Sequence, residues 1–233
     1  MAKAIVLLSG GLDSTICAGI AAKEHDPENI IGLSIDYGQK HAVELDSARD
    51  VVANLKIGSH IIESFPNIFG GYGSTLIDQE RDNPEMTYEE IQRIQGPSPT
   101  YVPFRNGNLL SMATAIALVE GAEWIYYGAH AEDARNFAYP DTTHEFNGAM
   151  ANAIFIGTYY KVRLVTPLQW LTKKDVVKLG FELGVPFHLT YSCYTGRRPS
   201  CGKCPTCISR IQAFKTIGIP DPIPYEVPID WRI

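Results

Sequence analysis

Residues 4–15 read AIVLLSGGLDST, an apolar run that ends in glycines, hydroxyl side chains and one aspartate. The two glycines let backbone N–H groups approach an anion, and a helix that starts nearby favours negative charge at its N-terminus. Ser9, Ser14 and Thr15 can donate hydrogen bonds to phosphate oxygens, and Asp13 can help to hold Mg²⁺. The stretch lacks the Gly-Lys-Ser/Thr ending of a loop that grips the β- and γ-phosphates of a hydrolysed triphosphate. It predicts a phosphate site of another kind; the alternative is a tight turn without a ligand.

A second chemical signal is the cysteine pattern C-x7-C-x2-C-x2-C, formed by Cys193, Cys201, Cys204 and Cys207. Two overlapping C-x2-C steps place four sulfurs where they can surround Zn²⁺ as a tetrahedron. A disulfide is disfavoured because no signal sequence indicates an oxidising compartment, and a redox pair would use two cysteines of the four. Four protein ligands leave no open coordination position, so we expect a structural zinc. The fifth cysteine, Cys17, is expected in the core.

Polar and aromatic residues also follow the predicted second strand, in the segment SIDYGQKH. Ligands of parallel sheets bind beyond the carboxyl ends of the strands. We therefore expect the residues of this segment to meet adenosine, with a solvated turn as the alternative. These residues are Asp36, Tyr37, Gln39 and His41.

Two later loops carry a similar concentration of functional side chains. In TYVPFRNGNLLS, Arg105 and Asn106 come just before a predicted helix, and an arginine is a good bidentate partner for a carboxylate or phosphate. The segment YYGAHAEDARNFAYPD follows the predicted fourth strand. Each of its residues could alone be a surface or capping residue, but together they indicate a substrate site. The polar and aromatic candidates are His130, Glu132, Asp133, Arg135, Tyr139 and Asp141.

Strands and helices that alternate along the chain must position these residues. Short apolar runs predict strands at residues 3–8, 30–36, 59–63, 124–130 and 162–165. Helical spacing predicts helices at residues 14–23, 41–55, 108–120, 144–158 and 173–183, a shorter one near 88–94 and a last one from about residue 205. Asp13 and Ser14 are expected to cap the first helix. The alternation is typical of an α/β fold with a parallel sheet and helical crossovers.

The same pattern suggests a division of the chain. Residues 1–185 are expected to form the nucleotide-binding α/β domain, interrupted at about 64–100 by an irregular insertion of the kind that often serves as a lid. Residues 186–233 are expected to form the zinc module, a last helix and an extended, proline-rich tail from residue 218.

The overall composition and net charge limit the classes of partner that the protein can have. The chain has 233 residues and a formal net charge of −6, with no block of lysine or arginine. Sequence-independent nucleic-acid binding would need a basic stripe, so no nucleic-acid partner is expected. No span approaches the roughly 20 apolar residues of a membrane helix, and no cleavable signal precedes the first strand. We therefore expect a cytoplasmic protein without a membrane partner.

The segment SGGLDS resembles the loop of the ATP-pyrophosphatase family, whose members activate a carbonyl or carboxyl oxygen by adenylation and release pyrophosphate. The resemblance implies a doubly wound, Rossmann-like parallel sheet. Together with YVPFRN, GAHAED, YPD, TPLQWLTKKDVVKLGFELGVP and the cysteine pattern, the chain closely resembles the 7-cyano-7-deazaguanine synthase family over residues 3–215. Many members of that family read Tyr-Pro-Asp-Cys, whereas here Tyr139, Pro140 and Asp141 precede Thr142. A cysteine role at that position is thus absent here.

The resemblance implies a ligase that converts 7-carboxy-7-deazaguanine, ammonia and ATP into a nitrile, with Mg²⁺, a structural Zn²⁺ on the four clustered cysteines, and a homodimer. It implies catalytic roles for Ser9, Asp13, Ser14 and Arg105. Substrate contacts are expected at Arg105, Asn106, His130, Asp133, Tyr139 and Asp141. ATP contacts are expected at Leu8, Ser9, Gly10, Gly11, Leu12, Asp13, Ser14, Thr15, Ile16, Cys17, Ala18, Asp36, Tyr37 and Gln39.

Two alternatives stay open at this point. A tRNA-thiolating or lysidine-type enzyme uses the same loop, but it would need a basic surface, and thiolation would need cysteines free for sulfur transfer. A non-enzymatic ATP sensor would leave the zinc module and the middle loops unexplained. The chain begins Met1-Ala2 and leaves no room for a glutaminase domain, so free ammonia is the expected nitrogen source.

Overall fold

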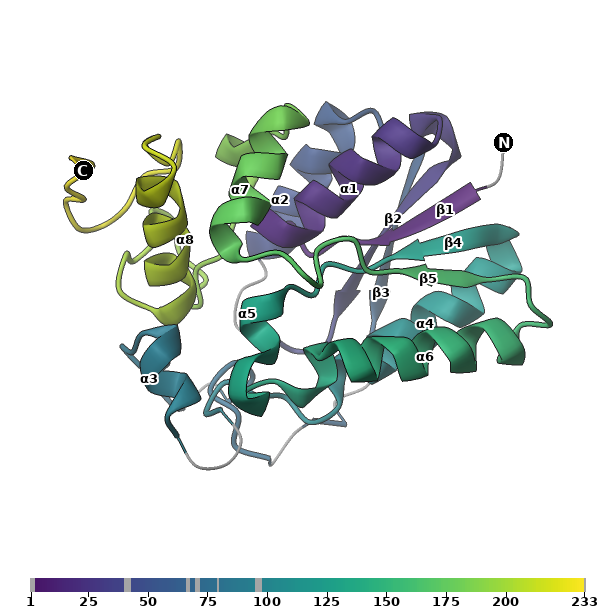
Figure 1. Cartoon of the computed structure of the whole chain (residues 1–233), viewed down its shortest axis with the longest axis horizontal. Helices are drawn as coiled ribbons and strands as arrows, with labels where there is room; N and C mark the ends of the chain where they lie inside the picture. Colours follow the sequence, from purple (N-terminus) through teal and green to yellow (C-terminus); the bar gives the residue numbers. More distant parts are fainter. Residues whose placement is uncertain are drawn as a thin grey trace.

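The structure is a computed structural model that describes residues 3–39, 43–65, 68–69, 72–78, 80–94 and 98–232 (Figure 1). Its strands are β1 (Lys3–Leu7), β2 (Ile30–Asp36), β3 (Ser59–Ser64), β4 (Ala122–Tyr126) and β5 (Arg163–Val165). Its helices are α1 (Leu12–Glu24), α2 (Val43–Asn54), α3 (Tyr88–Gln92), α4 (Arg105–Glu120), α5 (Ala131–Ala134), α6 (His144–Gly157), α7 (Lys173–Glu182) and α8 (Pro205–Thr216).

The five strands form one parallel sheet in the order β3-β2-β1-β4-β5. The central strand β1 pairs on one side with β2, where Ala4 lies opposite Ile30, and on the other with β4, where Ala4 lies opposite Trp124. The strand order therefore reverses between β1 and β4, which is the switch point at which doubly wound sheets bind ligands. The predicted fold class is confirmed.

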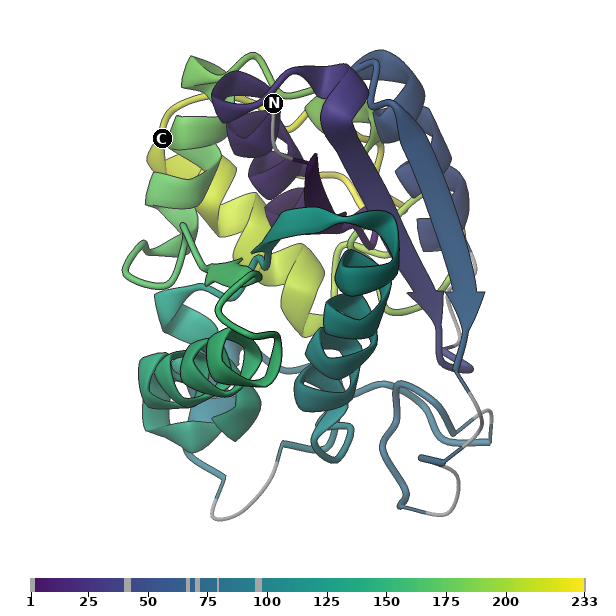
Figure 2. The ribbon, with the colours of Figure 1, turned by 90° about the vertical axis from the view of Figure 1, so that its right-hand side faces the viewer.

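Helices cover both faces of the sheet (Figures 1 and 2). On one face, α1, α2 and α7 bury a cluster that includes Ile16, Val51 and Val176. On the other face, α4 and α6 bury a second cluster that includes Leu110 and Ile154. Because β1 is covered on both faces, it is a continuous apolar run without polar alternation. Among the helices described, none combines the length and hydropathy needed to cross a bilayer.

A buried ion pair joins the C-terminal tail to α8. The Arg210 guanidinium donates to the Asp221 carboxylate from Nε at 2.6 Å and from Nη2 at 2.9 Å, and both side chains are almost fully buried. The Tyr225 hydroxyl donates to the same carboxylate at 2.6 Å. As predicted, residues 218–232 contain no helix or strand, apart from a single bridge between Tyr225 and Ser200. The α8 helix also contributes Phe214 to the cluster beneath α1 and α7.

Several element boundaries differ from the sequence prediction. β4 ends at Tyr126, so the segment up to His130 is loop, because only three residues of this strand find partners on the short β5. The α4 helix begins at Arg105 rather than residue 108, which brings Arg105 into its first turn. The short helix α3 is present, and the described residues of the insertion lie beyond the carboxyl ends of β2 and β3 (Figure 2).

Candidate active site and metal cluster

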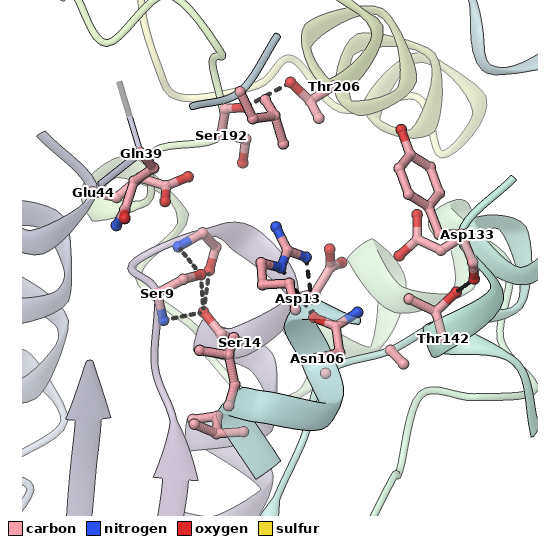
Figure 3. Close-up of a pocket in the computed structure, with 18 of the residues that line it drawn as sticks. Ser9, Asp13, Ser14, Gln39, Glu44, Asn106, Asp133, Thr142, Ser192 and Thr206 are labelled. Carbon is pink, nitrogen blue, oxygen red and sulfur yellow. Dashed lines mark hydrogen bonds between the residues drawn. The ribbon is translucent and has the colours of Figure 1, made fainter. Parts of the chain in front are cut away.

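A cavity opens at the carboxyl edge of the sheet, beyond the ends of β1, β2 and β4 (Figure 3). The loop between β1 and α1, the start of α2, the insertion, α4, α5, α7 and α8 all contribute to its lining. Polar and charged side chains therefore converge from segments far apart in the sequence. They include Ser9, Asp13, Ser14, Gln39, Glu44, Arg105, Asn106, Asp133, Asp141, Lys173, Ser192, Thr206 and Arg210.

The loop between β1 and α1 has a backbone that requires glycine. Gly10 has a φ of 82°, and a Cβ at this position would lie 2.2 Å from the backbone oxygen of Glu44. The Ser9 hydroxyl accepts a hydrogen bond from the Gly11 N–H at 3.2 Å and lies 3.0 Å from the Ser14 hydroxyl. These bonds fix a turn that presents hydroxyl groups and the start of α1 to the cavity.

The predicted cap of α1 was wrong. The helix begins at Leu12, with Gly11 as the N-cap residue and no side-chain cap, so Asp13 lies within the first turn. The Ser14 and Thr15 hydroxyls donate to the Gly11 backbone oxygen at 3.1 and 2.7 Å. Thr15 is fully buried by this contact, whereas Ser14 still lines the cavity.

An ion pair that the sequence did not predict lies beside this loop. The Lys173 ammonium, at the start of α7, donates to both Asp13 carboxylate oxygens at 2.7 and 2.6 Å. Burial by itself raises the pKa of Asp13, but the charge and hydrogen bonds of Lys173, together with the neighbouring His130 and Arg210, bring the pKa below its ordinary value. Lys173 Nζ also lies 3.3 Å from His130 Nε2, which lies 3.2 Å from the Asp133 carboxylate.

Arg105, in the first turn of α4, lines the same cavity. Its guanidinium donates to the Tyr37 hydroxyl at 3.1 Å and to Asn106 Oδ1 at 3.1 and 3.2 Å, and it lies over the Tyr37 ring. Burial lowers the pKa of Arg105, but the nearby Tyr37 and Asp141 raise it by more. The net pKa therefore lies above its ordinary value, and the guanidinium stays charged. The Asp141 carboxylate accepts the Asn106 backbone N–H at 2.9 Å. Among the described residues Arg105 forms no ion pair with a carboxylate, which leaves its charge available to an anion in the cavity.

Tyr139 connects the segment after β4 with the insertion. Its hydroxyl forms hydrogen bonds with the Thr100 and Ser98 hydroxyls, at 2.5 and 3.3 Å. Thr100 and Ser98 are buried, and Thr100 lines the cavity with Tyr139. The insertion is therefore anchored to the segment that follows β4.

The structure brings most of the predicted site residues to one cavity. Leu8, Gly11 and Leu12 of the loop line it, with Tyr37 and Gln39 after β2. The other predicted ATP contacts lie outside its lining: Gly10, Thr15, Ile16, Cys17, Ala18 and Asp36. Ile16, Cys17 and Ala18 have no exposed surface, because they are packed into the core cluster around α1. His130 is also buried behind the lining, and His41 lies outside the described residues.

Lys173, Glu44 and the α8 residues Thr206 and Arg210 are cavity residues that sequence reasoning missed. A local signal existed for Lys173, because Thr172 and Asp175 form a capping box that places Lys173 at the first position of α7. No sequence pattern around α8 indicates that this helix reaches the cavity, because its position depends on packing against α7.

The four clustered cysteines are all buried, and their Sγ atoms lie within 4.8 Å of one another. Hydrogen bonds from the Cys204 and Cys207 thiols lower the pKa of Cys193, which favours a thiolate. Cys201 and Cys207 Sγ lie 4.0 Å apart, close to the separation of two sulfurs on one tetrahedral metal. The cluster has the donor number, donor type and spacing that could hold a metal ion.

A doubly wound sheet with a glycine-rich, hydroxyl-bearing loop at its switch point, together with a four-cysteine cluster, defines a class of nucleotide-binding α/β proteins. The model of the family described as queuosine biosynthesis protein QueC matches residues 3–218, and the chain belongs to this family.

Individual relatives are similar over nearly the whole chain. A protein named 7-cyano-7-deazaguanine synthase from Persephonella marina is 40% identical over 94% of this chain and 94% of its own length. A protein of the same name from Koribacter versatilis is 42% identical over 96% of this chain and 93% of its own length. Among solved structures, the NH3-dependent NAD synthetase from Campylobacter jejuni is 15% identical with a TM-score of 0.47, covering 82% of this chain and 69% of that one. We draw no conclusion from a similarity at that level.

Proposed function

We propose that the chain is a ligase that converts 7-carboxy-7-deazaguanine and ammonia into 7-cyano-7-deazaguanine, with consumption of ATP. The family and the names of its relatives support this activity. The structural observation that carries it is Arg105, a cation that forms no salt bridge at contact distance within the described residues and lines the same cavity as the glycine loop. A carboxylate substrate that reacts with ATP needs a cation for its carboxylate and a phosphate-binding loop within one cavity.

In this proposal the triphosphate lies along residues 8–18. Ser9, Ser14 and the first N–H groups of α1 donate to phosphate oxygens, because those N–H groups have no partner within the helix. Adenosine lies beside Tyr37 and Gln39, which line the cavity beyond β2. Lys173 adds a positive charge at the same end. The core residues Ile16, Cys17 and Ala18 then hold α1 in place from behind and do not touch the nucleotide.

The acid lies beside Arg105 and the segment that follows β4. Arg105 pairs with its carboxylate, since a guanidinium matches the two oxygens of that group. The deazaguanine ring carries N–H donors, for which the Asp133 and Asp141 carboxylates are acceptors, and Asn106 and Tyr139 complete the lining. Burial raises the pKa of Asp141, against the hydrogen bond from the Asn106 backbone N–H, which lowers it.

The chemistry follows from counting atoms. A nitrile contains neither of the two carboxylate oxygens, so each must leave after it has been bonded to phosphorus. One carboxylate oxygen attacks the α-phosphorus of ATP and pyrophosphate leaves; ammonia then attacks the carbonyl carbon, and AMP leaves with that oxygen, giving the amide. A second activation, at the amide oxygen, lets this oxygen leave while nitrogen loses its protons. Ser9, Ser14 and the loop N–H groups stabilise the negative charge on the departing phosphates.

Two metal ions belong to the proposal. Asp13 is an oxygen ligand at the phosphate end suited to Mg²⁺, although here the cation beside it is the Lys173 ammonium. Mg²⁺ would neutralise phosphate charge. The four cysteine sulfurs are the soft donor set that Zn²⁺ takes in structural sites, and they hold together the segment before α8.

We also propose the division into residues 1–185 and 186–233, a cytoplasmic location, a homodimer and the absence of a nucleic-acid partner. The −6 net charge supports the last of these. Size measurement in solution and nuclease-resistant co-purification of RNA test the final two directly.

The activity is tested by measuring ATP consumption with purified protein, Mg²⁺, ammonium and 7-carboxy-7-deazaguanine, and with each component omitted in turn. We expect consumption that depends on both the acid and ammonium. ATP hydrolysis of equal rate without the acid would contradict the proposal, as would ATP binding without any turnover in the complete mixture.

A further inference from the structure

The outer surface of α4 and α6 differs in charge from that of the helices on the opposite face of the sheet. There, α2 and α7 expose charged side chains such as Asp46, Arg49 and Lys174. In contrast, residues 106–119 of α4 contain no charged side chain, and neither do residues 146–160 of α6 and the turn after it. A helix whose outer side faces water normally carries charged and polar residues there. Because α4 and α6 lie side by side, their outer sides together form one uncharged surface (Figures 1 and 2).

This surface is also apolar. The inner side of α6 packs Met150 and Ile154 into the core cluster that it shares with α4. On the outer side, Ile156 is 62% exposed, and Val119 at the end of α4 is 83% exposed. We call the exposed apolar residues of the two helices the α4/α6 face; they are Ala115, Leu118, Val119, Ala149, Ala153 and Ile156. Contiguous exposed apolar residues mark a surface that another molecule covers.

The turn after α6 adds two exposed aromatic rings at a conformational cost. Tyr159 and Tyr160 have φ values of 56° and 63°, in the left-handed region that disfavours residues other than glycine. The Tyr160 N–H donates to the Phe155 backbone oxygen at 2.7 Å, which holds the turn in this conformation. The two tyrosines are nevertheless 84% and 65% exposed. Tyrosine is enriched in protein–protein interfaces, so a partner that covers these rings gives the strained turn a use.

Charged residues lie only at the two ends of α6 and its turn. Glu145, in the first turn of the helix, has a side chain that is 65% exposed. Lys161, directly after the turn, is also exposed. The exposed Ala153 is midway between them in the sequence. This helix is therefore acidic at one end, basic at the other and uncharged between them, so it is complementary to a copy of itself that runs in the opposite direction.

We propose that the α4/α6 face binds the same face of a second copy of this chain, with the two α6 helices antiparallel about a twofold axis near Ala153. Symmetry then pairs Glu145 of each copy with Lys161 of the other, and the helix dipoles oppose each other. Small side chains at the crossing point allow the two helices to approach closely. A membrane surface would instead favour a face rimmed by basic residues alone. The proposal rests on the homodimer of the proposed function, for which it names the interface, and not on the reaction.

The test is sedimentation analysis of the full-length protein at about 10 µM, a concentration at which an interface of standard size holds two copies together. We expect the parent chain to sediment as a dimer. Ala153→Arg places like charges against each other at the crossing point and should weaken the dimer at least about 100-fold. Ala53→Arg is the matched control, because Ala53 is an exposed alanine of α2 on the opposite face of the sheet. This control should dimerise within about threefold of the parent chain.

Charge reversal tests the antiparallel orientation. Glu145→Lys and Lys161→Glu each bring two pairs of like charges together, so each should weaken the dimer by at least about fivefold at low salt. The double variant restores opposite charges at both ends and should return to within about threefold of the parent chain. If the double variant is as weak as the single variants, the proposed pairing is wrong and the proposal is overturned.

The remaining outcomes are equally decisive. Dimerisation of Ala153→Arg like that of the parent chain would overturn the proposal, as would equal disruption by Ala53→Arg. If circular dichroism shows that an arginine variant does not fold, the charge-reversal series decides instead. A monomeric parent chain would mean that another molecule, or none, covers the α4/α6 face, and it would overturn the proposal and the homodimer together. ATP consumption by the same preparation tests the proposed reaction separately, so the two failures are distinguishable.

Discussion

The ion pair between Arg210 and Asp221 gives a stability prediction whose size can be worked out. The Asp221 carboxylate accepts four hydrogen bonds: two from Arg210, one from the Tyr225 hydroxyl and one from the Ile223 N–H at 3.3 Å. In Asp221→Asn one carboxylate oxygen is replaced by an NH2 group. This group can only donate, so it faces the N–H groups of Arg210 or the hydroxyl of Tyr225 without an acceptor between them. The guanidinium then stays buried, 1% exposed, without an opposite charge.

Breaking a buried ion pair by neutralising one partner costs about 3–5 kcal/mol. For a chain of this size each kcal/mol lowers the unfolding midpoint by roughly 2–4 °C, so we expect a decrease of roughly 6–20 °C. The assay is thermal unfolding of metal-loaded protein followed by circular dichroism. Residues 218–232 should also become more susceptible to protease, since the pair holds the tail against α8.

The chain offers a matched control. Asp230 accepts hydrogen bonds from Arg232 at 2.8 and 2.9 Å, as short as those of the buried pair, but the two side chains are 58% and 90% exposed. Asp230→Asn should leave the midpoint unchanged, because solvent screens exposed pairs. Equal unfolding midpoints for the two variants would refute this reasoning. They would show that burial does not determine how much an ion pair contributes to the free energy of unfolding.

Arg105→Met should lower kcat/KM for the acid by about 30-fold or more, because it removes a charge-assisted bidentate contact, while ATP affinity measured without the acid stays within about threefold; equal kinetics would contradict the placement of the carboxylate. Cys204→Ser should lose bound metal and unfold at a lower temperature, whereas Cys17→Ser should keep its metal; metal analysis after dialysis distinguishes them. Thr172→Ala should cost about 1 kcal/mol at neutral pH because it breaks the capping box of α7. The hydrogen bonds from Thr172 lower the pKa of Asp175 below its ordinary 3.8, so their contribution is present above that pH and is lost as the pH falls through the folded-state pKa. Urea midpoints of this variant and the parent chain should therefore converge in acid, and a constant difference would count against the cap.

The fold could be predicted because each central element carries its own signal. β1 and β2 are short apolar runs buried on both faces, and the helices between them have apolar spacing that matches the two core clusters. Boundaries were less predictable. Residues 127–130 are apolar enough to extend β4, but its pairing with β1 and with β5 ends at Tyr126 on both sides.

The site was predictable where chemistry is local in the sequence. The glycine loop and the four cysteines are contiguous patterns, so their residues could be named in advance. Lys173, Glu44 and Arg210 reach the cavity through the packing of α7, α2 and α8, and no spacing in the chain encodes that convergence. The loop itself has no lysine, but Lys173 at the start of α7 lies beside it and donates to Asp13. Thr15 shows a contact that the pattern does not indicate, since its hydroxyl donates to the Gly11 backbone oxygen.

The central claim is that this cavity replaces both oxygens of a carboxylate with one nitrogen from ammonia. The most direct measurement is mass spectrometry of the product formed from 7-carboxy-7-deazaguanine, ATP, Mg²⁺ and isotopically labelled ammonium. The account predicts 7-cyano-7-deazaguanine that carries one labelled nitrogen and no oxygen from the carboxylate, preceded at early times by the labelled amide. Recovery of the unchanged acid alone, while ATP is consumed, would contradict it.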